Sequence, residues 1–243
     1  MKKTISVLLS IILLSIPSFA NANKEQNWYF SSKNRNERPG LPSLDQKLGV
    51  GIGKDEKVLY LTFDAGYENG NVEKIVDILK ENEVSGAFFV LKHFVEDNPA
   101  LCEKICAGGN LICNHTFSHR NIATLSEEEI KSELSQMETL YENVTGRKMS
   151  RFFRPPEGAY TQDALKTVSE MGYKTIFWSL AWADWDNNDQ KSPEYAMSKL
   201  LPRVHPGAVI LLHPTSKTNA MILGDFIQKM KDEGYRFGSL EEL

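Results

Sequence analysis

Cysteine is scarce in this sequence, with only three among 243 residues. An odd number cannot make a closed disulfide framework. Cys102 and Cys106 stand four apart in an expected helix and share a face, and Cys113 begins the triplet Cys-Asn-His. A zinc site is one interpretation, but no second Cys or His pair completes a tetrahedral set of ligands. We therefore expect the three cysteines to be small buried apolar residues.

Other signatures are absent as well. No polybasic segment is present, which argues against nucleic acid as a partner. No Gly-x-Ser-x-Gly motif is present, so a serine hydrolase has little support. The sequence contains neither low-complexity tracts nor internal repeats. The apolar run near residues 4–16 is shorter than the ~20 residues that a membrane-spanning helix needs.

The first 22 residues, MKKTISVLLSIILLSIPSFANA, have the layout of a secretory signal peptide. Two lysines precede an apolar run, and a small-x-small triplet ends at Ala22. We expect cleavage after Ala22 and secretion across the cytoplasmic membrane, with an uncleaved anchor as the alternative. No cysteine follows the run to carry a lipid. Losing Lys2 and Lys3 changes the formal net charge from -4 to -6, so the mature chain is mildly acidic.

Residues 23–56 are polar and punctuated by proline and glycine, which predicts an extension lying on the main domain. Its expected anchors are the aromatic residues Trp28, Tyr29 and Phe30. The segment GVGIG at residues 49–53 precedes a strand instead of following one, so it does not fit a phosphate-binding loop.

Residues 57–243 form the main domain, in which apolar strands alternate with helical stretches. Seven strands are expected, near residues 58–63, 85–91, 110–114, 151–154, 173–179, 208–212 and 235–237. Helices are expected near residues 71–83, 97–107, 126–146, 161–171, 193–202 and 220–233. This alternation predicts an α/β fold with parallel strands and crossover helices. The number of strands favours a closed or nearly closed barrel over a two-layer sheet.

Polar side chains stand where five of these strands end. They are Asp64, His115, Arg154, Asp184 and His213. In such folds the chemistry lies at the carboxyl ends of the strands, so these residues are expected to meet. Each also has a structural interpretation: a turn-capping aspartate, an ordinary ion pair, a buried histidine or loop packing.

His115 and His119 are four residues apart and can converge on one metal ion through neutral imidazole nitrogens. The alternative is one exposed and one buried histidine. Asp64 and His213 at neighbouring strand ends favour the metal interpretation.

The motifs TFDAG, HTFSH, RPPEG, WADW and LLH resemble, in this order, the five motifs of the NodB-homology polysaccharide deacetylases, carbohydrate esterase family four. The resemblance covers about residues 57–243. It implies a distorted (β/α) barrel with about seven parallel strands, preceded here by the short N-terminal extension. It also implies metal-dependent removal of N-acetyl groups from sugars.

The resemblance assigns roles to four of the strand-end residues. Asp64 resembles the catalytic base that deprotonates the attacking water, and Arg154 resembles the residue that orients it. His213 resembles the general acid that protonates the leaving amine, and Asp184 resembles the aspartate that tunes that histidine. These residue types suit amide hydrolysis, which needs an activated water, a polarised carbonyl and a protonated leaving nitrogen.

The resemblance makes His115 and His119 ligands of a divalent metal. Zinc suits imidazole best, while cobalt, manganese and magnesium stay open. Most of the family reads TFDD, with the second aspartate on the metal, but Ala65 stands here. Weaker binding is expected, with water or an oxygen of Glu68 or Asn69 as the replacement.

FDAGYENG and the other motifs look most similar to the delta-lactam-biosynthetic de-N-acetylases of spore-forming bacteria. The implied substrate is N-acetylmuramic acid in peptidoglycan glycan strands without stem peptides, after an N-acetylmuramoyl-L-alanine amidase has acted. The implied product is the precursor of muramic delta-lactam in the cell wall or spore cortex. Lys92 and Arg120 are candidate partners of the lactyl carboxylate, or ordinary surface charges. The alternatives are an N-acetylglucosamine deacetylase for peptidoglycan or chitin-like polymers and an inactive glycan-binding domain. A monomer is expected.

The sugar groove is expected to be formed by side chains beside the motifs: Trp182, Trp185, Tyr160, Phe117, Pro155 and Pro156. Barrel packing is the alternative for these aromatic residues, above all for Phe117.

Overall fold

The computed structural model describes residues 24–243, so the predicted signal peptide lies outside the described residues. The strands are β1 (Gln26–Asn27), β2 (Gly49–Val50), β3 (Val58–Ala65), β4 (Gly86–Val90), β5 (Leu111–Asn114), β6 (Ser150–Phe153), β7 (Ala159–Tyr160), β8 (Lys174–Ile176), β9 (Leu180–Ala181), β10 (Ala208–Leu212) and β11 (Arg236–Phe237). The helices are α1 (Val72–Glu81), α2 (Lys92–Asp97), α3 (Pro99–Ala107), α4 (Glu127–Thr145), α5 (Gln162–Glu170), α6 (Pro193–Leu200) and α7 (Lys217–Asp232).

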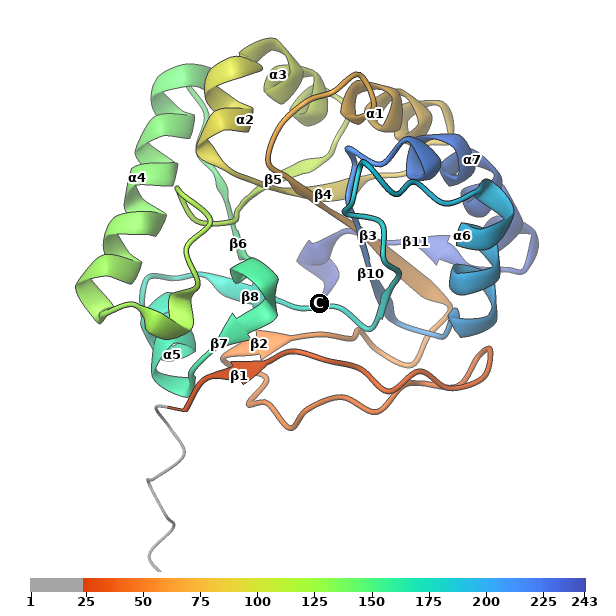
Figure 1. Cartoon of the computed structure of the whole chain (residues 1–243), viewed down its shortest axis with the longest axis horizontal. Helices are drawn as coiled ribbons and strands as arrows, with labels where there is room; N and C mark the ends of the chain where they lie inside the picture. Colours follow the sequence, from red (N-terminus) through yellow and green to blue (C-terminus); the bar gives the residue numbers. More distant parts are fainter. Residues whose placement is uncertain (1–23) are drawn as a thin grey trace, which may run out of the picture.

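Nine strands form one sheet, in the order β2-β8-β6-β5-β4-β3-β10-β9, with β11 beside the start of β3. The paired strands of this sheet are parallel. Figure 1 shows the curled sheet inside an arc of helices that runs from α4 through α2, α3 and α1 to α7 and α6. The predicted α/β barrel fold is confirmed. All seven expected strands are present, and the short strands β2 and β9 raise their number.

The sheet is most distorted between β8 and β9. The sequence predicts one strand over residues 173–179, but β8 ends at Ile176 and β9 begins at Leu180. β8 pairs with β6, whereas β9 pairs with β10. Across the break, the amide of Phe177 donates to the Val50 carbonyl and the amide of Ser179 donates to the Val209 carbonyl. Apolar residues continue through the break, so the hydrophobic pattern does not reveal it.

The helix expected over residues 97–107 is in fact the second of two. α2 ends at Asp97, and Asn98 has the non-helical φ of −134°. Pro99 then occupies the first turn of α3, where its missing amide hydrogen is no loss. A residue before proline is biased away from the helical region, which separates the two helices.

The long helix α4 begins and ends as its sequence predicts. The Ser126 hydroxyl accepts from the amide of Glu129, and the Glu129 carboxylate accepts from the amide of Ser126. This is the predicted capping box. Gly146 ends the helix with a φ of +67°, a left-handed conformation that glycine adopts without strain.

The extension joins the barrel at two places. β1 pairs antiparallel with β7, and β2 adds to the main sheet beside β8. Trp28 is buried, with 7% of its surface exposed, but Tyr29 is 60% exposed. The predicted aromatic anchor is therefore correct for Trp28 and wrong for Tyr29, because adjacent residues of an extended chain face opposite sides.

The three cysteines are free thiols, in agreement with the predicted absence of a disulfide framework. Cys102 and Cys113 are buried, and burial raises the pKa of Cys102 to about 12. Cys106 lies with its Sγ 3.2 Å from the Tyr141 hydroxyl. The prediction of small buried residues holds for Cys102 and Cys113, while Cys106 is half-buried. Within residues 24–243, no helix is both long and apolar enough to cross a membrane.

Candidate active site

Arg154 follows β6 and is fully buried beneath the carboxyl end of β3. Its Nη1 donates to Asp64 Oδ1 at 2.7 Å, and its Nη2 donates to Thr62 Oγ1 at 2.9 Å. Nε donates to the Ile176 carbonyl at 3.0 Å, and Nη2 also reaches the Phe177 carbonyl at 3.3 Å. A buried charge is costly unless it is paired and hydrogen-bonded. These bonds engage four of the five N–H groups of the guanidinium and fix its position.

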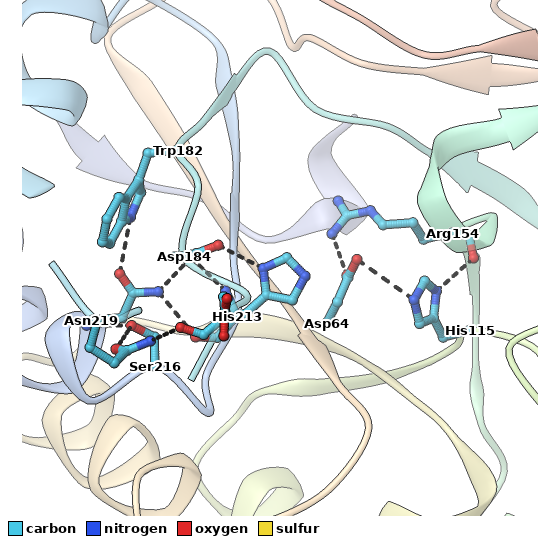
Figure 2. A network of polar contacts seen from close by, with 10 residues as sticks. Asp64, His115, Arg154, Trp182, Asp184, His213, Ser216 and Asn219 are labelled. Atoms are coloured by element: carbon cyan, nitrogen blue, oxygen red, sulfur yellow. Dashed lines mark hydrogen bonds and ion pairs between the residues drawn. The ribbon is translucent and has the colours of Figure 1, made fainter. Parts of the chain in front are cut away.

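Asp64 is mostly buried and ionised at neutral pH. Burial by itself raises its pKa, but the charge of Arg154, with His115 and His213 nearby, holds the pKa below its ordinary value. Figure 2 shows Asp64 between the Arg154 and His115 side chains. The carboxylate is therefore available to accept a proton.

His115 is buried and neutral at the end of β5. Its Nδ1 lies 2.8 Å from the carbonyl of Arg154, and only a protonated Nδ1 can donate to a carbonyl. Burial lowers the pKa of His115 to about 4. Its Nε2 lies 3.7 Å from Asp64 Oδ2, a contact that is no ion pair at neutral pH because the imidazole is uncharged. The lone pair of Nε2 is thus free to bind a ligand.

His119 is brought beside His115 by a tight loop, and their ring centroids are 5.1 Å apart. Thr116 and His119 both have positive φ angles, of 70° and 60°. Thr116 accepts from the amide of His119 at 2.9 Å, and Asn114 accepts from the amide of Thr116 at 2.9 Å. These bonds offset the cost of the left-handed residues.

Glu133 of α4 completes the support of this loop. One carboxylate oxygen accepts from the amides of Phe117 and Ser118 at 3.0 and 2.9 Å, and the other accepts from the Ser118 hydroxyl at 2.7 Å. Sequence reasoning missed this residue. The available signal was a charged residue on the buried face of α4, between Ile130 and Met137.

His213 and Asp184 form the second pair. Asp184 accepts from the His213 amide at 2.8 Å and lies 2.7 Å from His213 Nδ1. Asn219 of α7 donates to Asp184 at 2.6 Å and to the His213 carbonyl at 3.0 Å, and it was not predicted. Burial lowers the pKa of His213, but the hydrogen bond and charge of Asp184 outweigh burial and raise it. The cationic form of His213 is therefore favoured.

Asp64 of the pair Asp64–Arg154 and His213 of the pair His213–Asp184 border one cleft of about 590 Å³. It is lined by Asp64, Gly66, Leu91, His115, His119, Glu157, Trp178, Trp185, Leu211 and His213. Trp185 is 64% exposed, with its ring centroid 6.3 Å from that of His213. The Asp64 carboxylate, the imidazoles of His115, His119 and His213, and the Trp185 ring thus face one space.

Residues 51–176 match the polysaccharide deacetylase family, which is just over half of the chain. The chain belongs to this family. It is 38% identical over 253 aligned positions to the peptidoglycan-N-acetylmuramic acid deacetylase PdaA of Bacillus subtilis, covering 100% of this chain and 96% of that protein. The structure of PdaA, a family 4 carbohydrate esterase, superposes with a TM-score of 0.87 at 37% identity, covering 91% of this chain and 97% of that one.

Two other relatives widen the comparison. A peptidoglycan-N-acetylglucosamine deacetylase of Bacillus cereus is 31% identical, covering 75% of this chain and 66% of that protein. A family 4 pseudoenzyme of Bacillus anthracis superposes with a TM-score of 0.74 at 28% identity, covering 80% of this chain and 68% of that one.

Several predicted groove residues of this polysaccharide deacetylase lie away from the cleft. Tyr160 is fully buried, with its hydroxyl 3.2 Å from Gln26. Trp182 is 6% exposed and donates to Asn219 at 3.1 Å. Pro155 and Pro156 are buried behind Glu157, which lines the cleft instead and has a φ of 59°. A fully buried ring cannot stack on a sugar, so among the predicted aromatic residues only Trp185 enters our proposal below.

The remaining groove candidates are engaged elsewhere. Lys92 Nζ lies 5.0 Å from the centre of the Phe117 ring, and Arg120 pairs with Glu129 at 2.8 Å. None of Lys92, Phe117 and Arg120 lines the cleft.

The residues of the deacetylase fit a divalent ion through two imidazoles. Ala65 is fully buried and offers no donor. Glu68 accepts from the amides of Gly70 and Glu73, and Asn69 donates to the Thr215 carbonyl at 2.9 Å. Within residues 24–243, no group of three or more His, Cys, Asp or Glu side chains could hold an ion together. Both oxygens of Glu68, one of the two expected replacements, are therefore already hydrogen-bonded, whereas the Asn69 bond uses its NH2 group.

Proposed function

We propose that the protein is a secreted, metal-dependent deacetylase of N-acetylmuramic acid in peptidoglycan glycan strands that lack stem peptides. The released amine is the precursor of muramic delta-lactam in the spore cortex. The observation that carries this proposal is the pairing of Asp64–Arg154 and His213–Asp184 across one cleft. The similarity to PdaA over the whole chain supports the choice of sugar.

The side chains can divide the proton transfers of amide hydrolysis. Asp64, held ionised by Arg154, accepts a proton from water while the water oxygen adds to the acetyl carbonyl carbon. His213 has its Nδ1 engaged with Asp184, so its Nε2 proton goes to the leaving nitrogen as the C–N bond breaks. The products are acetate and a free amine on the sugar. Trp185 at the cleft offers a ring face on which a sugar can stack.

His115 and His119 would hold the divalent ion, with zinc as the first choice. When bound, such an ion polarises a carbonyl and lowers the pKa of water. The Arg154 carbonyl orients His115 for this task, since it fixes the proton on Nδ1.

The second candidate is an N-acetylglucosamine deacetylase, favoured by the similarity to the Bacillus cereus enzyme. A third is an inactive glycan-binding domain, because the family includes a pseudoenzyme and Ala65 removes a ligand. The intact hydrogen bonds of both catalytic pairs speak against inactivity.

The proposed setting follows from the substrate. Peptidoglycan lies outside the cytoplasmic membrane, which agrees with the signal peptide predicted from the sequence. An amidase that strips stem peptides would act first, and we propose that the deacetylase works as a monomer.

The test is mass spectrometry of glycan products made by purified residues 23–243. Peptidoglycan is offered with and without prior removal of stem peptides, each with zinc or with a chelator. We expect acetyl loss from muramic acid on the stripped strands alone, abolished by the chelator. Acetyl loss from glucosamine would select the second candidate. No acetyl loss from any substrate with metal supplied would select the inactive domain.

A further inference from the structure

The N-terminal extension reaches the wall of the cleft through Trp28. The indole Nε1 donates to the Trp178 carbonyl at 2.7 Å, and the backbone amide of Trp28 donates to the Gly158 carbonyl at 2.8 Å. The indole also stacks on Phe177, with centroids 4.2 Å apart and planes 14° from parallel. Trp178 and Glu157, the residue before Gly158, both line the cleft.

Three successive carbonyls in the break between β8 and β9 are held by two side chains. Those of Ile176 and Phe177 accept from Arg154, and that of Trp178 accepts from Trp28. Strand pairing ends at Ile176 and resumes at Leu180. Arg154 and Trp28 thus supply the side-chain bonds to this segment, beside the backbone bond from the Phe177 amide to Val50.

The glycines around Trp28 fit this arrangement. A Cβ at Gly51 would lie 2.2 Å from the indole, too close for any real contact. A Cβ at Gly158 would lie 2.7 Å from the Trp178 ring and 3.1 Å from the Trp28 Cβ. Gly51 of the GVGIG segment thus makes room for the indole, which gives this glycine a steric role.

We propose that Trp28 is a positioning residue for the deacetylation reaction. It holds the Trp178 carbonyl and so fixes the segment 176–178, in which the carbonyls of Ile176 and Phe177 hold the Arg154 guanidinium. Through that guanidinium it orients the Asp64 carboxylate. Trp28 lies outside the matched region 51–176, so the extension supplies a part of the site that the family match does not contain. The kinetic part of the test rests on the proposed function, whereas the spectroscopic part does not.

The kinetic test compares Trp28→Phe with Tyr235→Phe. Each substitution removes one hydrogen bond that anchors the extension, because the Tyr235 hydroxyl pairs with Asn36 at 2.9 Å far from the cleft. We expect Trp28→Phe to lower kcat for acetate release by roughly 10–10²-fold with KM within about twofold, since small misplacements of reacting groups have large rate effects. Tyr235→Phe should leave both constants unchanged. Equal kcat values in the two variants would overturn the proposal.

Gly51→Ala tests the same contact from the other side. Its methyl group should displace the intact indole and lower kcat as Trp28→Phe does. The double variant Trp28→Phe with Gly51→Ala should regain thermal stability, because the methyl fills space that the indole leaves. Its kcat should stay low, because the bond to Trp178 is still missing. Recovery of kcat along with stability would reduce Trp28 to a packing residue and refute the positioning role.

The spectroscopic test needs no substrate. The Arg154 Nε–H group donates to Ile176, so its signal in a ¹⁵N correlation spectrum reports the guanidinium directly. Arg154→Lys assigns the signal. We expect Trp28→Phe to shift it and to speed its hydrogen exchange at least tenfold, and Tyr235→Phe to do neither. An unshifted, equally protected signal in Trp28→Phe would overturn the proposal even if wild-type activity on peptidoglycan were absent.

Discussion

At the scale of single residues, the site contains two carboxylates with different tasks. Asp64 faces the cleft and is charge-balanced by the buried Arg154, whereas Asp184 lies behind His213 and does not line the cleft. In the proposed mechanism the same side-chain type thus serves as a proton acceptor in one place and as a support in the other, and the surroundings decide which.

Replacing Asp64 with asparagine should abolish turnover, because an amide cannot accept the proton. The shape and the hydrogen bond acceptor for Arg154 are kept, so affinity for glycan strands should change little. Acetate release and a glycan pull-down measure the two properties side by side. If the variant keeps even a tenth of the activity, Asp64 is not the base.

Replacing His213 with alanine should lower kcat by about 10²–10⁴-fold, the usual effect of losing a general acid. His93→Ala is the control, since that histidine is exposed and lies outside the cleft. The measurement is acetate release at saturating substrate. An unchanged rate would remove His213 from the mechanism.

The Asp184→Asn substitution should move the alkaline limb of the activity profile to lower pH. Asp184 raises the pKa of His213, so the protonated acid survives to higher pH in the wild type. The same pair stabilises the fold below the ordinary histidine pKa, and this contribution is lost as pH rises through the raised value. The profile of kcat against pH checks the first effect, and coinciding alkaline limbs would contradict it.

At the scale of elements, the sequence predicts the strands and helices themselves better than it predicts the contacts and breaks between them. Apolar runs mark β3, β4 and β10, and those of β3 and β10 lead to Asp64 and His213 as expected. The break at 177–179, the support from Glu133 and the hydrogen bond from Trp28 to Trp178 were not predicted. Each of them is a contact between residues far apart in the chain, and local patterns carry no record of such contacts. The two predicted catalytic pairs were brought together because parallel strands end at one edge.

Glu133 provides a prediction for helix α4. Truncation by Glu133→Ala should weaken zinc binding by 10–100-fold, the usual effect of losing a partner behind metal ligands. Glu133→Gln should bind within about twofold of wild type, since its amide oxygen can accept from the two backbone amides and its NH2 group can donate to the Ser118 hydroxyl oxygen. Glu128→Ala, exposed on the same helix, is the control. Competition with a chromophoric chelator gives the dissociation constants, and equal values for the alanine and wild-type proteins would contradict this role.

At the scale of the whole molecule, the extension and the barrel share one core. Trp28 packs in the same cluster as Phe177, Tyr160 and Leu165, the last of which belongs to α5. The chain before residue 51 therefore contributes both an edge strand, β2, and part of the interior. It should behave as part of the cooperative unit and not as an appended tail.

Deleting residues 23–48 from the mature chain should lower the free energy of unfolding by more than the ~3–5 kcal/mol that removing a buried tryptophan alone costs. The deletion also exposes Phe177 and Tyr160, which are otherwise fully buried. Urea denaturation followed by circular dichroism measures the change, with Trp28→Ala as the comparison. If the truncated protein unfolded at the same midpoint as the mature chain, the extension would be dispensable for the fold. If the truncated protein had the same free energy of unfolding as Trp28→Ala, the whole stabilising contribution of the extension would belong to one indole.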